Sequence, residues 1–100
     1  MRPILPGDLD AAARCLMAAG ASRRPAMAAN LVARADLADR FRKRTGRLHP
    51  CHGDGSLMAV ARLAGAGAAI WRCDADYCRC LALVLDALED RRAAGWARAA

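Results

Sequence analysis

The sequence predicts an all-α protein, a small bundle of about four helices with an irregular central loop. Alanine, the residue with the highest helix propensity, supplies 26 of the 100 residues, whereas the aromatic side chains that strands favour make up only 4%. Larger apolar residues recur at intervals of three and four, which is the period of an amphipathic helix. A chain of this length has room for one core, so we expect a single helical domain over residues 1–100.

Two helices are predicted in the first half of the chain. Asp8 is a good N-cap for the first, and Gly20 is placed to end it as a C′ residue. Ser22 can cap the second helix, which runs to Thr45 and stops at Gly46. The expected buried residues are Leu9, Ala12, Ala13, Leu16 and Met17 in the first helix, and Met27, Leu31, Ala35, Leu37, Ala38 and Phe41 in the second.

Proline and glycine exclude regular structure between Arg47 and Gly55, and two further helices are predicted after this loop. Ser56 is placed to cap a short third helix, and Asp74 or Asp76 to cap a fourth that Gly95 ends. The expected buried residues are Leu57, Met58, Val60, Ala61 and Leu63 in the third helix, and Tyr77, Leu81, Val84, Leu85 and Leu88 in the fourth.

Basic residues outnumber acidic ones by 16 to 10, which gives a net charge of +6. Such a charge favours polyanionic partners, although 15 arginines beside abundant alanine and glycine also match the codon bias of a GC-rich genome. The cations gather on the exposed face of the second predicted helix, where they also complement the helix dipole. The candidate binding residues are Arg34, Arg40, Arg42, Lys43, Arg44 and Arg47.

Zinc-type ligands occur in the central loop and near the start of the last helix: His49, Cys51, His52, Cys73, Cys78 and Cys80. Neither group has the C-x₂-C spacing of a zinc knuckle. On a helix, Cys78 and Cys80 point about 200° apart and cannot both face one ion, so Cys80 is expected to pack in the core. The sequence leaves open whether the other five converge, and we predict no metal or cofactor, with a small zinc-binding domain as a remaining alternative.

No arrangement typical of an enzyme is present in the sequence. Cys51 with His49 or His52 is the only local nucleophile and base pair, and neighbours in sequence need not be neighbours in space. The run from Gly53 to Ser56 lacks the lysine and the preceding strand of a phosphate-binding loop. We therefore expect a protein without catalytic activity.

The sequence also bears on the compartment. No apolar run approaches the roughly 20 residues of a membrane span, and no secretory signal is recognisable. Five cysteines, an odd number, fit reduced thiols better than a disulfide framework. These observations predict a cytoplasmic protein that does not bind membranes.

Two classes of function remain. A core so rich in alanine favours an exposed helix face that a protein partner or a second copy covers, with Trp71 and Trp96 as candidate anchors. The alternative is a nucleic-acid-associated regulator that uses the Arg40 to Arg47 surface, joined by Arg23 and Arg24. Few aromatics accompany the cations and no helix-turn-helix spacing is present, so we favour the protein-binding module.

Three stretches of the sequence carry a resemblance: Met1-Arg2-Pro3; Thr45-Gly46-Arg47-Leu48-His49-Pro50 with Gly53-x-Gly55-Ser56-Leu57-Met58; and Asp76-Tyr77-x-x-Cys80-Leu81-Ala82. The chain resembles a family of short uncharacterised α-proteobacterial proteins with a TGRxHPxxGxGSLM-like core. That resemblance implies a bacterial cytoplasmic origin and no assigned activity. The family pattern has tryptophan near His52 and asparagine near Asp54 and does not include Cys51. It thus implies a structural loop based on His49, Gly53, Gly55 and Ser56 rather than a zinc site.

Overall fold

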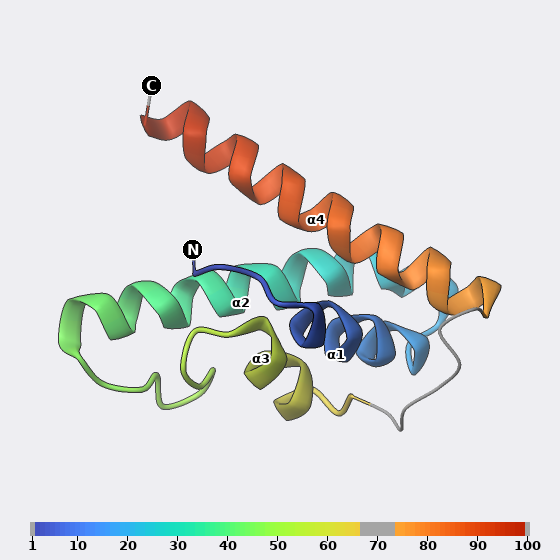
Figure 1. Cartoon of the computed structure of the whole chain (residues 1–100), viewed down its shortest axis with the longest axis horizontal. Coiled ribbons are helices and arrows are strands. Elements are labelled where there is room, and N and C mark those ends of the chain that lie inside the picture. The colour runs from blue at the N-terminus through green and yellow to red at the C-terminus, as the bar shows by residue number, and fades with distance from the viewer. Residues whose placement is uncertain (1, 67–73, 100) are drawn as a thin grey trace.

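The computed structural model describes residues 2–66 and 74–99, with side chains as far as residue 94 (Figure 1). The helices in order are α1 (Pro6–Met17), the 3-10 turn η1 (Ala21–Arg23), α2 (Arg24–Thr45), α3 (Leu57–Leu63) and α4 (Ala75–Ala99). These described residues contain no strand, only an isolated bridge between His49 and Gly53. The predicted small all-α bundle with an irregular central loop is confirmed.

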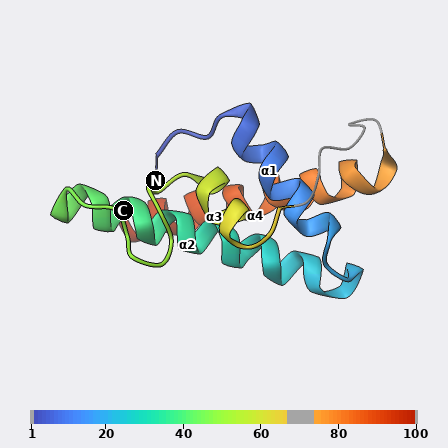
Figure 2. The same cartoon turned by 90° about the horizontal axis from the view of Figure 1, so that it is seen from below.

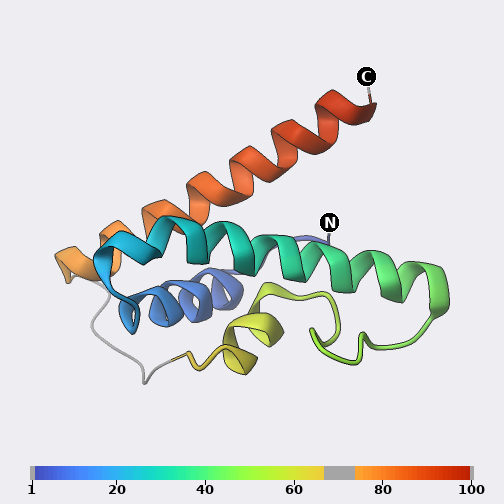
Figure 3. The same ribbon diagram turned by 180° about the vertical axis from the view of Figure 1, so that it is seen from behind.

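Helix α1 contacts α2, α3 and α4, and α2 likewise contacts α1, α3 and α4. Three consecutive alanines of α1, Ala11 to Ala13, are completely buried, because alanine lets neighbouring helices approach closely on more than one side. Helix α3 contacts both α1 and α2 (Figure 2). Helices α2 and α4 run in the same direction and diverge toward their carboxyl ends (Figures 1 and 3). The largest wholly buried side chains are Leu16, Leu31, Val32, Leu57, Val60, Cys80 and Val84.

Three leucines predicted to be buried are instead exposed: Leu37 by 51%, Leu63 by 66% and Leu85 by 47%. At 100° per residue, Leu37 lies on the side of α2 opposite its buried alanines and leucine, and Leu63 and Leu85 lie to the side of the buried residues of their helices. On α2 the aspartates Asp36 and Asp39 are buried in place of Leu37. Periodicity locates a stripe on a helix, but the positions of the other helices decide how wide the covered part is.

Asp8 is not the N-cap that the sequence predicts. Helix α1 begins at Pro6, whose fixed φ suits the first helical turn, and Asp8 is the third residue of that turn. Its Oδ2 accepts a hydrogen bond from the Leu5 amide (2.8 Å), and its Oδ1 accepts one from the Met58 amide (3.0 Å). Because Met58 lies in the first turn of α3, one buried carboxylate satisfies amides at the start of two helices.

Three other predicted helix ends are confirmed. Gly46 ends α2 in the left-handed conformation, with φ of 71°. The Ser56 hydroxyl caps α3 by accepting from the Ala59 amide (3.1 Å). The Asp74 carboxylate accepts from the amides of Asp76 (2.7 Å) and Tyr77 (3.4 Å) and so caps α4.

Three predicted boundaries are wrong. Gly20 has φ of −61° and lies beyond α1, which ends at Met17. Ser22 lies inside η1 and does not cap α2, which starts at Arg24. Gly95 does not end α4, which continues to Ala99. A single glycine in a helix costs only about 1 kcal/mol relative to alanine, so neighbouring residues can carry the helix through it.

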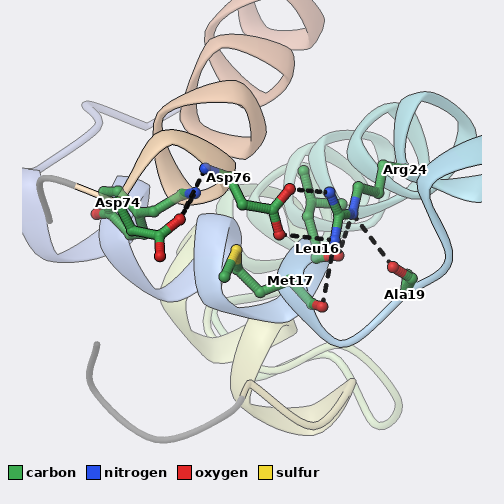
Figure 4. Close-up of polar contacts among 7 residues, drawn as sticks. Leu16, Met17, Ala19, Arg24, Asp74 and Asp76 are labelled. Carbon is green, nitrogen blue, oxygen red and sulfur yellow. Dashed lines mark hydrogen bonds and ion pairs between the residues drawn. The ribbon is translucent and has the colours of Figure 1, made fainter. Parts of the chain in front are cut away.

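Arg24 joins three helices at one end of the bundle (Figure 4). Its guanidinium donates to the carbonyl oxygens of Leu16 (3.0 Å), Met17 (3.4 Å) and Ala19 (3.1 Å) at the end of α1. It also forms a two-pronged ion pair with Asp76 in the first turn of α4, at 2.7 and 3.1 Å. This side chain is only 13% exposed. The expectation that Arg24 belongs to an exposed nucleic-acid surface is therefore wrong. A cation at the amino end of α2 opposes the helix dipole, and these tertiary contacts offset that effect.

We predict that Arg24→Ala lowers the midpoint of thermal unfolding, because it removes a cap of α1 and the tie to α4 together. The unfolding midpoint of Arg24→Lys should lie between those of Arg24→Ala and the natural protein, since an ammonium group cannot reproduce the planar two-pronged pairing. Arg23→Ala is the matched control, because Arg23 is the exposed neighbour. Equal unfolding midpoints for Arg24→Ala and Arg23→Ala in a circular dichroism melt would contradict this role.

Candidate functional site: the basic end of the second helix

The carboxyl end of α2 and the loop over residues 46–56 form one end of the molecule (Figure 3). All the predicted binding residues other than Arg34 lie there, and Arg34 is exposed in the middle of α2. All of them are exposed, and the structure divides those at this end into an inner group bound to buried carboxylates and an outer group without such partners.

The inner group consists of Arg40 and Lys43. Arg40 donates to Oδ2 of Asp36 (2.8 Å), and Arg91 of α4 lies at 2.8 Å from the same oxygen. Lys43 pairs with Oδ2 of Asp39 at 2.9 Å. Both carboxylates are buried, at 4% and 7% side-chain exposure, so these pairs hold the last turns of α2 in one arrangement.

The outer group consists of Arg42, Arg44 and Arg47, all exposed. Arg42 Nη1 lies 3.4 Å from the Asp54 carbonyl oxygen, at the outer limit of a hydrogen bond. The Arg44 guanidinium lies over the Phe41 ring, 5.9 Å from its centroid, which is a cation–π distance. Within the described part of the chain, Arg47 forms no ion pair. These three side chains therefore present positive charge to solvent.

The central loop folds around His49. Its backbone exchanges hydrogen bonds with Gly53 (3.0 and 3.3 Å), and its Nδ1 accepts from the amides of Cys51 (3.0 Å) and His52 (3.1 Å). The His49 ring stacks on His52 and meets Phe41 edge to face, with centroids 4.7 and 5.1 Å away. These contacts attach the loop to the last turns of α2.

Gly53 and Gly55 both have left-handed backbone, with φ of 82° and 96°. A Cβ on Gly55 would lie 2.7 Å from the Asp39 Cα atom, closer than real contacts allow. The loop backbone thus packs directly against the backbone of α2, and only glycine fits this approach.

The described residues do not assemble a metal site. No cluster of three or more His, Cys, Asp or Glu side chains with suitable geometry occurs among residues 2–66 and 74–94. Nδ1 of His49 already accepts two amides, Cys51 and Cys78 are exposed, and Cys80 is buried as expected. Cys73 and Trp71 lie outside the described residues, as does the side chain of Trp96.

Sequence reasoning missed the aspartates that organise this surface. Asp36 with Arg40 and Asp39 with Lys43 have the i, i+4 spacing of helical ion pairs, a signal that is present in the sequence. Asp54 has no basic residue at i, i+4 spacing that would have indicated its role. Arg2 and Arg42, which are 52 and 12 positions away in the sequence, donate to its backbone carbonyl oxygen (3.3 and 3.4 Å). Three carboxylates therefore lower the net charge of this end.

The environment shifts the pKa of two of these carboxyls downward. Burial acts to raise the pKa of Asp36, but the hydrogen bond from Arg91 and the charges of Arg40 and Arg91 outweigh it. Hydrogen bonds from Ser56 lower the pKa of Asp54, and the charges of Arg2 and Arg42 lower it further. Both groups are therefore charged at neutral pH.

The fold and this surface define a small all-α bundle with a cationic helix end and an ordered loop against it. The chain belongs to the family described as a domain of unknown function, DUF7742, whose model matches residues 2–88. Neither a curated protein nor a solved structure is significantly similar to the chain. In the part of the chain that the structure describes, no helix is long and apolar enough to span a membrane.

We predict that Gly55→Ala destabilises the protein by about 2 kcal/mol or more, because it combines left-handed backbone with a clash against α2. Urea unfolding measures the change. Gly20→Ala is the control, since Gly20 has φ of −61° and open space around its Cα, and it should be neutral or stabilising by about 0.5 kcal/mol. Similar losses in both variants would contradict the close packing of the loop.

Stability should depend on pH through Asp36 and Asp54, whose folded pKa values lie below the unfolded value of about 4. The unfolded state binds protons first as pH falls, so their contribution is complete above about pH 5 and is lost as pH falls through the folded values. Unfolding free energy measured from pH 7 to pH 2.5 should decline below about pH 4. Asp36→Asn should reduce that decline; an unchanged profile would remove Asp36 from this explanation.

Proposed function

We propose that this protein is a non-enzymatic binding module that contacts an acidic protein partner through Arg42, Arg44 and Arg47. One observation carries the proposal. Buried aspartates bind the inner cations and fix the end of α2, while the outer cations extend from this rigid end into solvent. A fixed cationic surface loses less side-chain entropy on binding than a flexible one, and opposite charge speeds association with an acidic partner.

The arrangement of reactive side chains supports a role without catalysis. Cys51 is exposed, and the Nδ1 of the neighbouring His49 already accepts two backbone amides instead of facing the thiol as a base. The aspartates with described partners, such as Asp8, Asp36 and Asp76, form caps and ion pairs that explain the folded structure. Binding is the function that these surfaces suit.

A cytoplasmic location is part of this proposal. Cys15 and Cys80 are buried as thiols, and burial raises the pKa of both. Buried thiols with raised pKa values react slowly and persist in a reducing compartment.

Nucleic-acid binding is the second candidate, because arginine pairs well with phosphate and three outer arginines lie close together on the chain. It ranks lower for two reasons. Asp36, Asp39 and Asp54 reduce the charge of the surface. Phe41, the aromatic side chain beside the cations, already contacts His49 and Arg44 rather than being available to a base.

Titration with polyglutamate, duplex DNA and RNA at two salt concentrations tests both candidates. Arg44→Glu with Arg47→Glu should weaken polyglutamate binding by at least ~10-fold, because two attractions become repulsions. Lys43 and Arg40 are left in place, since reversing them would put like charges beside buried carboxylates. Arg62→Glu with Arg92→Glu is the matched control, having the same charge change at two exposed sites elsewhere.

Tighter binding of DNA or RNA than of polyglutamate, with affinity falling steeply with salt, would replace the protein-binding proposal by the nucleic-acid candidate. Equal weakening by the control pair would show attraction to net charge alone. No binding of any of these polyanions would overturn both candidates.

A further inference from the structure

Two arginines from distant parts of the chain donate to one atom of the central loop. Arg2 lies in the segment before α1, and Arg42 lies in the last turn of α2. Nη1 of Arg2 is 3.3 Å from the backbone carbonyl oxygen of Asp54, and Nη1 of Arg42 is 3.4 Å from the same oxygen. Because both nitrogens are within hydrogen-bond reach of a single atom, the two guanidiniums lie close together. We refer to them as the arginine pair.

The packing of the loop fixes the atom that the arginine pair shares. A Cβ on the next residue, Gly55, would lie 2.7 Å from the Cα atom of Asp39, so the loop backbone packs directly on α2. The side chain of Asp54 is oriented by α3, because its Oδ1 accepts a hydrogen bond from the amide of Ser56, the N-cap of that helix (2.9 Å). The point where the two arginines meet is thus present before any ligand binds, which lowers the entropy cost of binding.

Each guanidinium of the arginine pair keeps a fork of two N–H donors free. The Nε and Nη2 atoms of an arginine present parallel N–H bonds that match the two oxygens of a carboxylate. In both Arg2 and Arg42 the nitrogen bound to Asp54 is Nη1, so this fork is not used. Neither arginine donates any other hydrogen bond within residues 2–66 and 74–94. The Arg2 side chain is 36% exposed and Arg42 is exposed, so a ligand can approach both.

The charge around the arginine pair suits an anion with a single charge. Oδ1 of Asp54 lies 3.8 Å from Nη1 of Arg2. Hydrogen bonds from Ser56, and then the charges of Arg2 and Arg42, lower the pKa of this carboxyl, so it is ionised at neutral pH. Two cations beside one carboxylate leave one positive charge uncompensated. A carboxylate carries one negative charge, whereas a phosphate monoester carries nearly two.

We propose that Arg2 and Arg42 together bind one carboxylate of the acidic partner, the side chain of a glutamate or an aspartate, through their free forks. The two oxygens of a carboxylate have about four acceptor sites, which is enough for two forks. This site adds Arg2 to the contact residues, and it recognises the shape of the carboxylate as well as its charge. It rests on the proposed function, because it names the group that the acidic partner presents.

Variants that keep the charge test the forks, with a short capped glutamate peptide as the probe. Arg2→Lys and Arg42→Lys should each raise the Kd of the peptide by ~10-fold, because lysine keeps the positive charge but has no planar fork. Arg62→Lys is the matched control, the same substitution at an exposed site on α3, and it should leave the Kd unchanged. The circular dichroism spectra of all three variants should match that of the natural chain.

A carboxylate shared by two arginines predicts that their contributions are coupled. A chain with both Arg2→Lys and Arg42→Lys should lose less affinity than the product of the two separate losses, because the first substitution already weakens the grip of the second fork. NMR signals of the arginine Nε–H groups give a second readout on the natural chain. The signals of Arg2 and Arg42 should shift along one binding curve as the glutamate peptide is added, and that of Arg62 should not shift.

The outcomes separate this site from the proposed function. Unchanged peptide affinity in Arg2→Lys, or losses that multiply in full, would overturn the shared carboxylate and leave the proposed function intact. A matched phosphoserine peptide that binds more tightly than the glutamate peptide would overturn the carboxylate as the ligand. If Arg2→Lys weakens binding but Arg44→Glu with Arg47→Glu does not, the arginine pair is supported and the wider surface is contradicted. No binding of the glutamate peptide to the natural chain would overturn both.

Discussion

The guanidinium of Arg24 determines where three of the four helices meet. It binds the last carbonyls of α1 and the Asp76 carboxylate of α4, while its own backbone begins α2. Helices α2 and α4, which Arg24 ties at this end, run in the same direction and diverge toward the other end (Figure 1). A hollow whose lining includes Val32, Leu83 and Ala87 lies between the two helices. The second tie, from Arg91 to Asp36, uses a long side chain that bridges the widening gap.

Buried carboxylates connect the helices of this protein, a role that larger apolar side chains have in a thicker core. Asp8 joins α1 to α3, Asp36 joins α2 to α4, and Asp39 lies under the loop at Gly55. Each is bound by amides or cations, since a buried charge without partners would be strongly destabilising. The alanines supply close approach between helices, and the aspartates add contacts that fix one arrangement.

These ties also shape the outer surface. By binding Arg40 and Lys43, the aspartates order the end of α2 and leave Arg42, Arg44 and Arg47 toward solvent. The same narrow core leaves Leu37 and the alanines beside it uncovered. The exposed cations and the exposed Leu37 thus lie on parts of α2 that the other described helices do not cover.

The sequence alone determined the helical class, the stop at Gly46, the cap at Ser56 and most of the buried stripes, because propensity, caps and periodicity are local properties. The run of basic residues also indicated the cationic end of α2. Only the tertiary structure decided that Arg24 faces inward, that Asp8 serves two helices, and that Leu37 is uncovered. The first two outcomes depend on contacts between residues 52 and 50 positions apart, Arg24 with Asp76 and Asp8 with Met58, and spacing along the chain carries no record of such contacts.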